Sequence, residues 1–353
     1  MSVGITAITP LRIGFLVGNP TAQLASFATV LLAFEAHRRG HDVSLVGADD
    51  LTVSPDGRIS ARLHRAPAPA ADAGAWLAAA LQADAPAESL DQLDVLVIRL
   101  LARPKGLDED DGRYDTWYRG RIEAALTFAR YLQRSSPRTL VLNDPVGVWS
   151  SSGKLWLGQL PEGIAPRTLV SRDAVAIRRF VEAEPGGAVL KSLMGHGGED
   201  VFRVSAGDPN LTAVVSTLLR QGFIVAQQFL PEVEQGERRL LLLDGEPLRS
   251  ADGVPALYLR RHAPHDWRTN VHQGASTEAC ELRPRDVEIA AALKPLLLAR
   301  GLWLVGVDIV GQHVLEVNAF CPGGIGIARR LTGFDAAVPI VDDLEGRVAS
   351  ARA

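Results

Sequence analysis

The feature that most constrains this fold is a stretch near the C-terminus with the pattern of a β-hairpin. Residues 305–318, VGVDIVGQHVLEVN, form two short apolar runs separated by Gly311-Gln312. The first run carries Asp308, and the second carries Glu316 and Asn318. Residues two apart on a strand point to the same face, and the partner strand of a hairpin can bring a third residue beside them. The hairpin therefore predicts that these three polar side chains converge.

Two carboxylates and one amide oxygen suit a magnesium ion, which proteins hold through one or two carboxylates together with substrate phosphates. An acidic pair on a hairpin more often marks an exposed polar face. Here apolar residues fill the rest of both strands, and charges are rarely buried without a partner or a metal. The hairpin therefore predicts a metal site made of Asp308, Glu316 and Asn318. Because such a site usually acts on phosphates, the rest of the sequence can be searched for residues that would bind a nucleotide.

The composition narrows the function classes. The 353 residues are enough for two or three domains, and 47% hydrophobic with 22% charged residues is typical of a globular protein. A formal net charge of −4 does not favour a nucleic-acid partner. Cys280 and Cys321 have no CxxC or Cys/His spacing, which argues against a structural zinc site or a disulfide framework. No signal-peptide or membrane-spanning pattern is present, so we expect a cytoplasmic protein.

The first part of the chain alternates strands and helices. This βαβ pattern predicts a parallel sheet covered by helices, with an inserted hairpin that turns at Pro55-Asp56-Gly57. The alanine- and proline-rich residues 66–87 predict a helix between loops. The expected strands are 12–18, 42–46, 94–99 and 139–142, and the expected helices are 22–39 and 114–133.

The second part, from about Asn143, is richer in strands and predicts an α+β half. We expect strands or extended segments at 167–170, 188–191, 201–204, 223–229, 238–243, 247–248 and 255–261, and helices at 174–183, 211–221 and 287–300.

Two lysines are candidates for binding phosphates. Lys191 ends the apolar strand AVLK and precedes a glycine-rich loop with Gly195, Gly197 and Gly198. Glycines let backbone N–H groups approach phosphates, and a lysine adds a point charge. The second candidate is Lys154. Each signal is weak alone, because the glycine-rich loop could be an ordinary tight turn and Lys154 could be a solvated surface lysine.

Other candidates follow along the chain. The bend at Gln228-Phe229-Leu230 could offer backbone N–H and C=O groups to a planar ring, and Glu237 could accept hydrogen bonds from ribose hydroxyls. Arg260 ends an apolar strand, and a guanidinium there could stabilise a phosphate or an oxyanion. Arg268 and Asn270 follow in a polar loop. A strand end facing water is the simpler explanation for each of these positions.

Taken together, these motifs resemble the prokaryotic glutathione synthetase branch of the ATP-grasp ligases. The resemblance runs from about residue 13 to 344. It rests on the segments NDPVG with GKL, AVLKSLMGHGGEDVFRV, VAQQFLPEV, GERRLLLLDGEPL, RTNVHQGA and GLWLVGVDIVGQHVLEVNAFCPGGI. It implies an ATP-grasp fold with an N-terminal parallel α/β domain at 1–138, a central lid at 139–228 and a C-terminal antiparallel-sheet domain at 229–353.

The resemblance also implies roles for the candidate residues. Lys154 and Lys191 would hold the nucleotide phosphates, with the glycine loop closing over them. Gln228, Phe229 and Leu230 would hold adenine, and Glu237 the ribose. Arg260 would lie near the acyl phosphate, and the metal set would be Asp308, Glu316 and Asn318.

The implied reaction joins a small-molecule carboxylate to an amine. ATP would phosphorylate the carboxylate, the amine would attack the acyl phosphate, and two Mg²⁺ ions, with Mn²⁺ as a substitute, would neutralise phosphate charge. Closure of residues 195–200, and of 262–275, would exclude water. The resemblance further implies a homodimer or homotetramer, with no nucleic-acid or membrane partner.

The departures from glutathione synthetase cluster on the substrate side. Gln23-Leu24-Ala25-Ser26 and the run from Arg99 to Pro104 lack the family's charged residues, although Arg99 itself remains. The glycine loop ends in the acids Glu199-Asp200, and the segment after Asn318 reads AFCPGG. We therefore expect substrates other than γ-glutamylcysteine and glycine, with Arg99, Arg268, Asn270, Cys321, Gly323 and Gly324 near them.

Three alternatives stay open at this point. The chain could be a glutathione synthetase whose substrate pocket has drifted. It could be a non-catalytic ATP-binding module that acts through partners, although both lysines, the metal set and Arg260 argue against this. It could also be a kinase-like phosphoryl transferase that consumes no amine.

Overall fold

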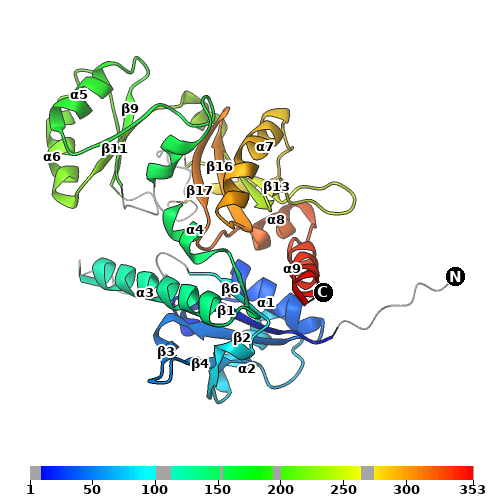
Figure 1. The fold of residues 1–353 in the computed structure, drawn as a ribbon. Coiled ribbons are helices and arrows are strands. Elements are labelled where there is room, and N and C mark those ends of the chain that lie inside the picture. The colour runs from blue at the N-terminus through cyan, green and yellow to red at the C-terminus, as the bar shows by residue number, and fades with distance from the viewer. Residues whose placement is uncertain (1–8, 101–112, 152–153, 194–199, 264–273, 353) are drawn as a thin grey trace. The chain divides into compact units, whose positions relative to one another are not determined.

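The structure is a computed structural model that describes residues 9–100, 113–151, 154–193, 200–263 and 274–352 (Figure 1). Its contacts divide the chain into two compact units. The first contains Met1–Trp149 together with Asp335–Ala353, and the second contains Ser150–Phe334. Of the helices in the described ranges, none combines the length and apolar character needed to cross a membrane.

The first unit is built on one sheet with the order β3-β4-β2-β1-β6-β7, and β5 pairs with β4. Strands β2, β1, β6 and β7 are parallel, which confirms the predicted parallel layer, whereas β3, β4 and β5 are antiparallel. The strands are β1 (Arg12–Val17), β2 (Asp42–Gly47), β3 (Thr52–Val53), β4 (Ile59–His64), β5 (Ala87–Ser89), β6 (Val95–Ile98) and β7 (Leu140–Leu142).

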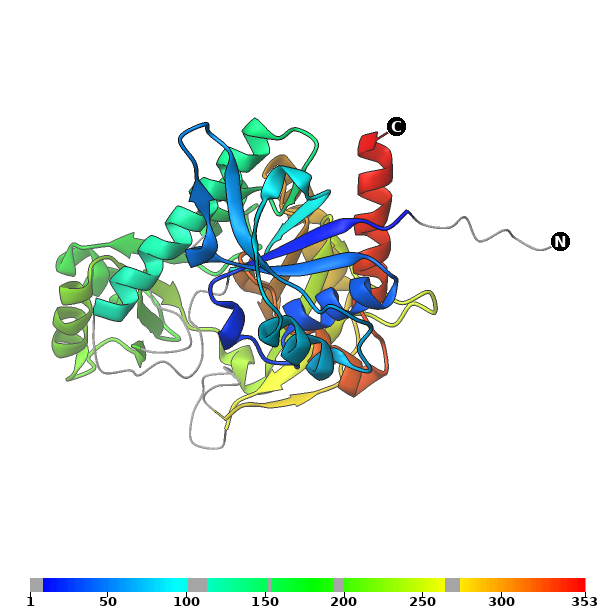
Figure 2. The same cartoon turned by 90° about the horizontal axis from the view of Figure 1, so that it is seen from below.

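Helices cover both faces of this sheet, with α1 and α2 on one face and α3 on the other (Figures 1 and 2). The helix expected from residue 22 begins only at Ala28, because the side chain of Asn19 accepts the N–H of Thr21 and caps a short 3-10 turn, and the chain is extended at Phe27. The helices are η1 (Pro20–Ala22), α1 (Ala28–Arg38), η2 (Ala48–Asp50), α2 (Ala73–Gln82), η3 (Leu90–Gln92), α3 (Arg113–Ser135), α4 (Pro145–Ser150) and α9 (Ala337–Arg352).

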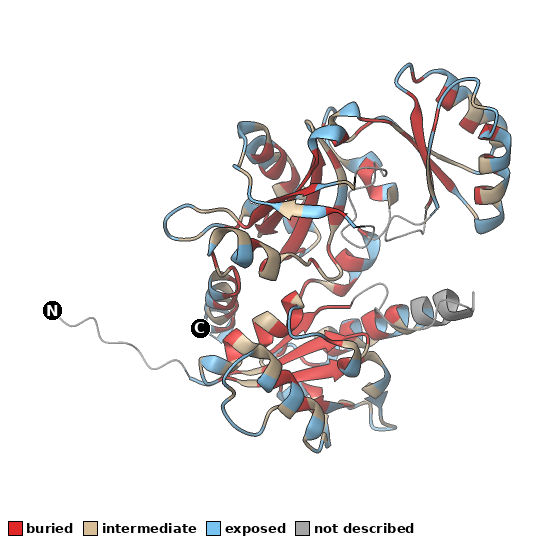
Figure 3. Cartoon of the chain, turned by 180° about the vertical axis from the view of Figure 1, so that it is seen from behind, coloured by how far each residue is buried: buried red, intermediate tan, exposed pale blue. Residues whose placement is uncertain are grey.

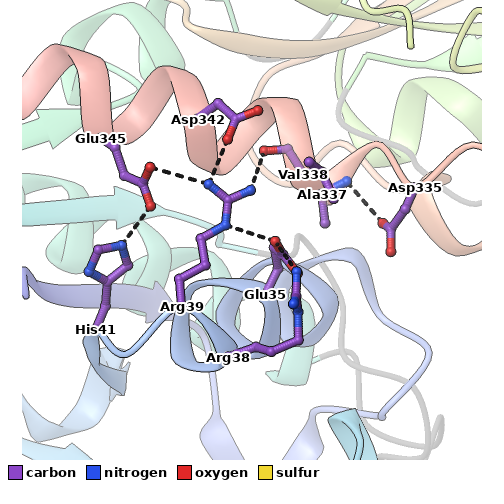
Figure 4. Close-up of polar contacts among 9 residues, drawn as sticks. All are labelled: Glu35, Arg38, Arg39, His41, Asp335, Ala337, Val338, Asp342 and Glu345. Atoms are coloured by element: carbon purple, nitrogen blue, oxygen red, sulfur yellow. Dashed lines mark hydrogen bonds and ion pairs between the residues drawn. The ribbon is translucent and has the colours of Figure 1, made fainter. Parts of the chain in front are cut away.

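The C-terminal helix α9 packs on α1 and belongs to the first unit. Arg39 joins the two helices, since its guanidinium lies 2.8 Å from Glu35, 2.6 Å from Asp342 and 3.2 Å from Glu345 (Figure 4). His41 lies 2.8 Å from the same Glu345. The sequence suggested a C-terminal domain of residues 229–353, but residues 335–353 belong to the first unit. They do so because this ion-pair network holds α9 to α1.

The second unit begins with a four-stranded antiparallel sheet in the order β10-β9-β11-β8. Helices α5 and α6 cover one face through Ile177, Val181, Val215 and Leu218. The elements are η4 (Lys154–Gln159), β8 (Thr168–Ser171), α5 (Ala174–Glu182), β9 (Ala188–Ser192), β10 (Val201–Val204), α6 (Leu211–Gln221) and β11 (Ile224–Gln228).

An antiparallel sheet in the order β15-β14-β12-β16-β17 completes the second unit, with β13 on β12. Its strands carry mostly buried residues (Figure 3). On one face Arg238 is paired with Asp286 of α7 at 2.7 Å, which leaves its neighbour Arg239 to the opposite face. The elements are η5 (Pro231–Gln235), β12 (Glu237–Leu243), β13 (Glu246–Pro247), β14 (Leu257–Arg261), β15 (Ser276–Glu278), α7 (Pro284–Ala299), β16 (Leu304–Val310), β17 (His313–Asn318) and α8 (Ile325–Thr332).

Candidate active site

The predicted hairpin is present as β16 and β17, joined at Gly311-Gln312. Asp308 lies directly opposite Glu316 in the register, and Asn318 lies opposite Gly306. The amide Nδ2 of Asn318 donates to Oδ2 of Asp308 at 3.3 Å. The two carboxylates and the amide therefore share one face, as the alternation predicted.

Strands β12 and β14 extend this polar face. Arg239 pairs with Asp308 in the register, and Glu237 pairs with Arg260. Glu237 and Arg239 are two residues apart, so they point to the same face of the sheet. We call the set Glu237, Arg239, Arg260, Asp308, Glu316 and Asn318 the polar sheet face.

Asp308 is the centre of an ion-pair cluster on this face. It is 3% exposed, and Nη2 of Arg239 donates to its Oδ2 at 2.7 Å. Arg260 donates to Oδ1 of Asp308 and also pairs with Glu237. Burial alone would raise the pKa of Asp308, but the charges of the two guanidinium groups outweigh it and hold that pKa below its ordinary value. Asp308 is therefore ionised at neutral pH and well bonded.

Arg239 is the functional candidate that the sequence reasoning missed. Burial would lower the pKa of its guanidinium, and the charge of Asp308 instead raises it. The signal was available in the alternation of β12, since a residue two positions after Glu237 on a strand must share its face. What the sequence could not show is that β16 lies beside β12 and places Asp308 opposite Arg239.

The two lysines predicted to hold phosphates lie near each other and near this face. The Nζ of Lys191 donates to Oε1 of Gln227 at 2.9 Å, and the Nζ of Lys154 donates to the carbonyl of Leu193 at 3.4 Å. Burial, and then the positive charge of Lys154, lower the pKa of Lys191 to about 8, while Glu316 and Glu237 oppose the shift. The positive charges of the two lysines thus repel each other, and an anion bound beside them would relieve this repulsion.

The bend after β11 forms a small apolar cluster in which Phe229 and Leu230 pack with Val189 and Val310. The N–H of Gln228 donates to the carbonyl of Arg167 at 2.9 Å, and the N–H of Phe229 donates to that of Gly187 at 3.1 Å. These two N–H groups are therefore already bonded to backbone carbonyls, contrary to the expectation that the bend exposes its N–H groups. An adenine contact here would rest on the apolar side chains and on other backbone groups.

The residues expected near the substrate are distributed over both units. Arg99 lies in the first unit, is 2% exposed, and donates from Nε to Oγ1 of Thr29 at 3.1 Å. Cys321, Gly323 and Gly324 follow β17 in the second unit, and Gly324 precedes the first turn of α8. Gly195, Gly197, Gly198, Arg268 and Asn270 lie outside the described residues.

The oxygen atoms of Asp308, Glu316 and Asn318 are of the ligand types that magnesium accepts, and in this structure Asp308 is bonded to two arginines. Within the described ranges, no cluster of three His, Cys, Asp or Glu side chains is arranged to hold a metal. The carboxylates of Asp308 and Glu316 would therefore need the amide of Asn318 and phosphate oxygens to complete the shell, which is the usual arrangement for Mg²⁺. Glu316 is exposed, and no ion pair of its carboxylate is found among the described side chains.

Comparisons with solved structures define the class of fold. The ATP-grasp ligase PsnB, complexed with a phosphomimetic variant of minimal precursor, Mg and ADP, superposes with a TM-score of 0.62 at 18% identity, covering 96% of this chain and 99% of its own. The D-cycloserine synthetase DcsG gives a TM-score of 0.59 at 18% identity, covering 95% and 99%. The chain therefore has the ATP-grasp fold, as the sequence predicted.

Sequence comparisons give the family. Residues 153–333 match the model of the prokaryotic glutathione synthetase ATP-grasp domain. A glutathione synthetase of Brucella melitensis biotype 1 is 32% identical over 93% of this chain and 96% of its own length, and one of Rhodopseudomonas palustris is 39% identical over 64% and 69%. The chain belongs to the prokaryotic glutathione synthetase family of ATP-grasp ligases, which confirms the predicted resemblance and an enzyme that forms C–N bonds.

Proposed function

We propose that this enzyme uses ATP to join a small-molecule carboxylate to an amine through an acyl phosphate. The observation that carries the proposal is the gathering of Lys154 and Lys191 beside Glu237 and Glu316. Paired lysines provide charge for a polyphosphate, and the adjoining polar sheet face provides the oxygen ligands and guanidinium groups that phosphoryl transfer needs.

The proposed reaction has two steps. In the first, an oxygen of the carboxylate attacks the γ-phosphorus of ATP, the bond to the bridging oxygen breaks, and ADP leaves. In the second, a neutral amine attacks the acyl carbon, inorganic phosphate leaves with the bonding pair, and the nitrogen loses a proton. Arg260 would donate hydrogen bonds to the oxyanion of the second step, and Arg239 would assist it from the neighbouring strand.

Lys154 and Lys191 would hold the phosphates, and Glu237 would accept hydrogen bonds from the ribose. The bend at Gln228, Phe229 and Leu230 would pack against adenine. Magnesium would be held by Asp308, Glu316 and Asn318, and when bound it would neutralise phosphate charge and orient the transferring group. We further propose two such ions, with Mn²⁺ able to replace them.

We also propose that the four-stranded sheet, within residues 139–228, is the lid over the nucleotide. The apolar cluster of Phe229 and Leu230 with Val189 and Val310 supports this, because it joins β9 to β16 at the bend. Closure would keep water from hydrolysing the acyl phosphate.

For the substrates, we propose an acid and an amine other than γ-glutamylcysteine and glycine. The support is the replacement of charged substrate-side segments in this chain and the burial of Arg99, whose Nε is bonded to Thr29. The alternative is glutathione synthetase itself, which the names of the relatives favour.

The test is ADP release from purified protein with ATP, Mg²⁺ and a panel of carboxylates and amines, including γ-glutamylcysteine with glycine. Lys191→Met, which removes a phosphate-binding charge, is the inactive control. Amide formation with another pair supports the proposal, and turnover only with γ-glutamylcysteine and glycine identifies glutathione synthetase. A stable phosphorylated product without an amine requirement, or nucleotide binding without turnover on any substrate, would refute the ligase reaction.

A further inference from the structure

Tyr258 is a polar side chain of the sheet face that neither the metal set nor the phosphate set uses. It lies on β14, two residues before Arg260, and directly opposite Arg239 on β12. Its position in the register therefore puts it on the same face as both arginines. Tyr258 is 3% exposed, so its ring is part of the packed surface of this site.

The ring of Tyr258 occupies the space that a side chain at Gly324 would need. A Cβ atom built on Gly324 would lie 2.7 Å from Cε1 and 2.9 Å from the hydroxyl oxygen of Tyr258. Gly324 also has φ 111°, which other residues rarely adopt. The glycine and the tyrosine thus fit only as a pair, and the hydroxyl lies beside the Cα that precedes α8.

Gly306 of β16 lies close both to Arg239 and to the same loop, residues 321–324. A Cβ built on Gly306 would lie 3.3 Å from Cδ of Arg239 and 3.5 Å from Cβ of Pro322. Tyr258 thus borders this loop at Gly324, and Arg239 and Pro322 both border Gly306. This loop is one of the segments in which the sequence departs from glutathione synthetases.

The guanidinium groups of Arg239 and Arg260 interact electrostatically with the Tyr258 hydroxyl, and Asp308 pairs with both of them. The first turn of α8 starts beside the same hydroxyl. Arginine forks bind carboxylates, and the start of a helix adds a favourable partial charge. Among the described residues, no hydrogen-bond partner of this hydroxyl is found.

We propose that Tyr258 determines the specificity for the acid substrate: its hydroxyl donates a hydrogen bond to the carboxylate that is activated, and its ring against Gly324 limits the size of that acid. The inference rests on the proposed ligase function. The residue that determines which acid substrate is bound is thus expected on β14, in the ATP-grasp half of the chain.

The test measures activation of the acid without the amine. Hydroxylamine traps an acyl phosphate as a hydroxamate, so the KM of γ-glutamylcysteine and of other amino-acid and dipeptide carboxylates can be determined alone. Tyr258→Phe keeps the ring and removes the hydroxyl. We expect it to raise the KM for the acid about tenfold, as for loss of a hydrogen bond to a charged group, with the Kd of ADP changed less than twofold.

Two further variants control the result. Tyr131→Phe removes a tyrosine hydroxyl in the first unit, where it donates to the carbonyl of Gly57, and should leave both constants unchanged. Tyr258→Ala should admit bulkier acids. Gly324→Ala should raise the KM for the acid in the wild-type background, and by a smaller factor when combined with Tyr258→Ala, since the ring that it would strike is then absent.

An unchanged KM for the acid in Tyr258→Phe, in an enzyme that forms hydroxamate, would overturn this inference and leave the proposed function standing. Equal changes in the KM for the acid and the Kd of ADP would also overturn it, because a structural role would then explain both. Absence of hydroxamate in the wild type with every acid, despite ADP binding, would instead refute the proposed function and the inference with it.

Discussion

The lowered pKa of Lys191 gives a quantitative prediction about nucleotide binding. Its pKa of about 8 lies well below the ordinary 10.5, because burial and the charge of Lys154 disfavour the ammonium form. The phosphates of a bound nucleotide would surround the same nitrogen with negative charge and restore a high pKa. Binding would then require the protonated lysine, and would take up a proton whenever the free protein had lost it.

The magnitude follows from the two pKa values. If the bound pKa returns to the ordinary value, the observed affinity is almost flat below pH 7. It falls about tenfold between pH 7 and pH 9, as the protonated fraction of free Lys191 drops from about 0.9 to about 0.1. The pH dependence of folding stability has the opposite sign to that of nucleotide affinity. The unfolded chain keeps this proton up to the ordinary pKa, so this lysine makes the free energy of unfolding rise with pH between about 8 and 10.5.

The assay is calorimetric titration of ADP at pH 7, 8 and 9 with Mg²⁺ held constant, in buffers of different ionisation enthalpy so that proton uptake is counted. Lys191→Arg stays charged throughout and should remove this decline. Lys154→Gln weakens binding overall, but it removes the like charge and should move the decline to higher pH. A wild-type affinity that does not change, or a decline that moves to lower pH in Lys154→Gln, would refute this account of the lysine pair.

Asp308→Asn should destabilise the protein by about 3 kcal/mol, because it leaves two buried guanidinium groups without their carboxylate, whereas Glu316→Gln should change the free energy of unfolding by less than about 0.5 kcal/mol. Both should abolish Mg²⁺-dependent turnover, and denaturant unfolding beside ADP release separates the two effects. Mg²⁺ without nucleotide should bind only weakly, which titration of the metal with and without ADP will measure. Arg39→Met should cost about 2 kcal/mol by loosening α9, against less than about 1 kcal/mol for the more exposed Arg38→Met, as measured by chemical denaturation.

Much of the hairpin was predictable because its determinants are local. The apolar alternation defines β16 and β17, and Gly311, with φ 55°, occurs where the turn needs a left-handed residue. The same alternation predicted that Asp308 and Glu316 lie opposite each other. Periodicity likewise predicted α6 at Leu211–Gln221 with the observed bounds.

The contacts that could not be predicted from the sequence are those between elements that lie far apart along the chain. The partner of Asp308 was expected to be a metal, yet the described side chains that neutralise it are Arg239 and Arg260, brought from β12 and β14 by the strand order. The docking of α9 on α1 was likewise missed, since Arg39 and Asp342 are separated by 303 residues. No local sequence pattern predicts a contact between residues so far apart in the chain.

The pairing of Asp308 with arginines has a consequence for how ligands arrive. A magnesium ion that takes Asp308 must displace at least one guanidinium, and a buried guanidinium without a carboxylate is strongly unfavourable. The exchange becomes favourable only when another anion takes over the arginine, and phosphate and substrate carboxylate are the anions that the proposed reaction supplies. Metal, nucleotide and acid should therefore bind with positive coupling, because each provides the charge that the others remove.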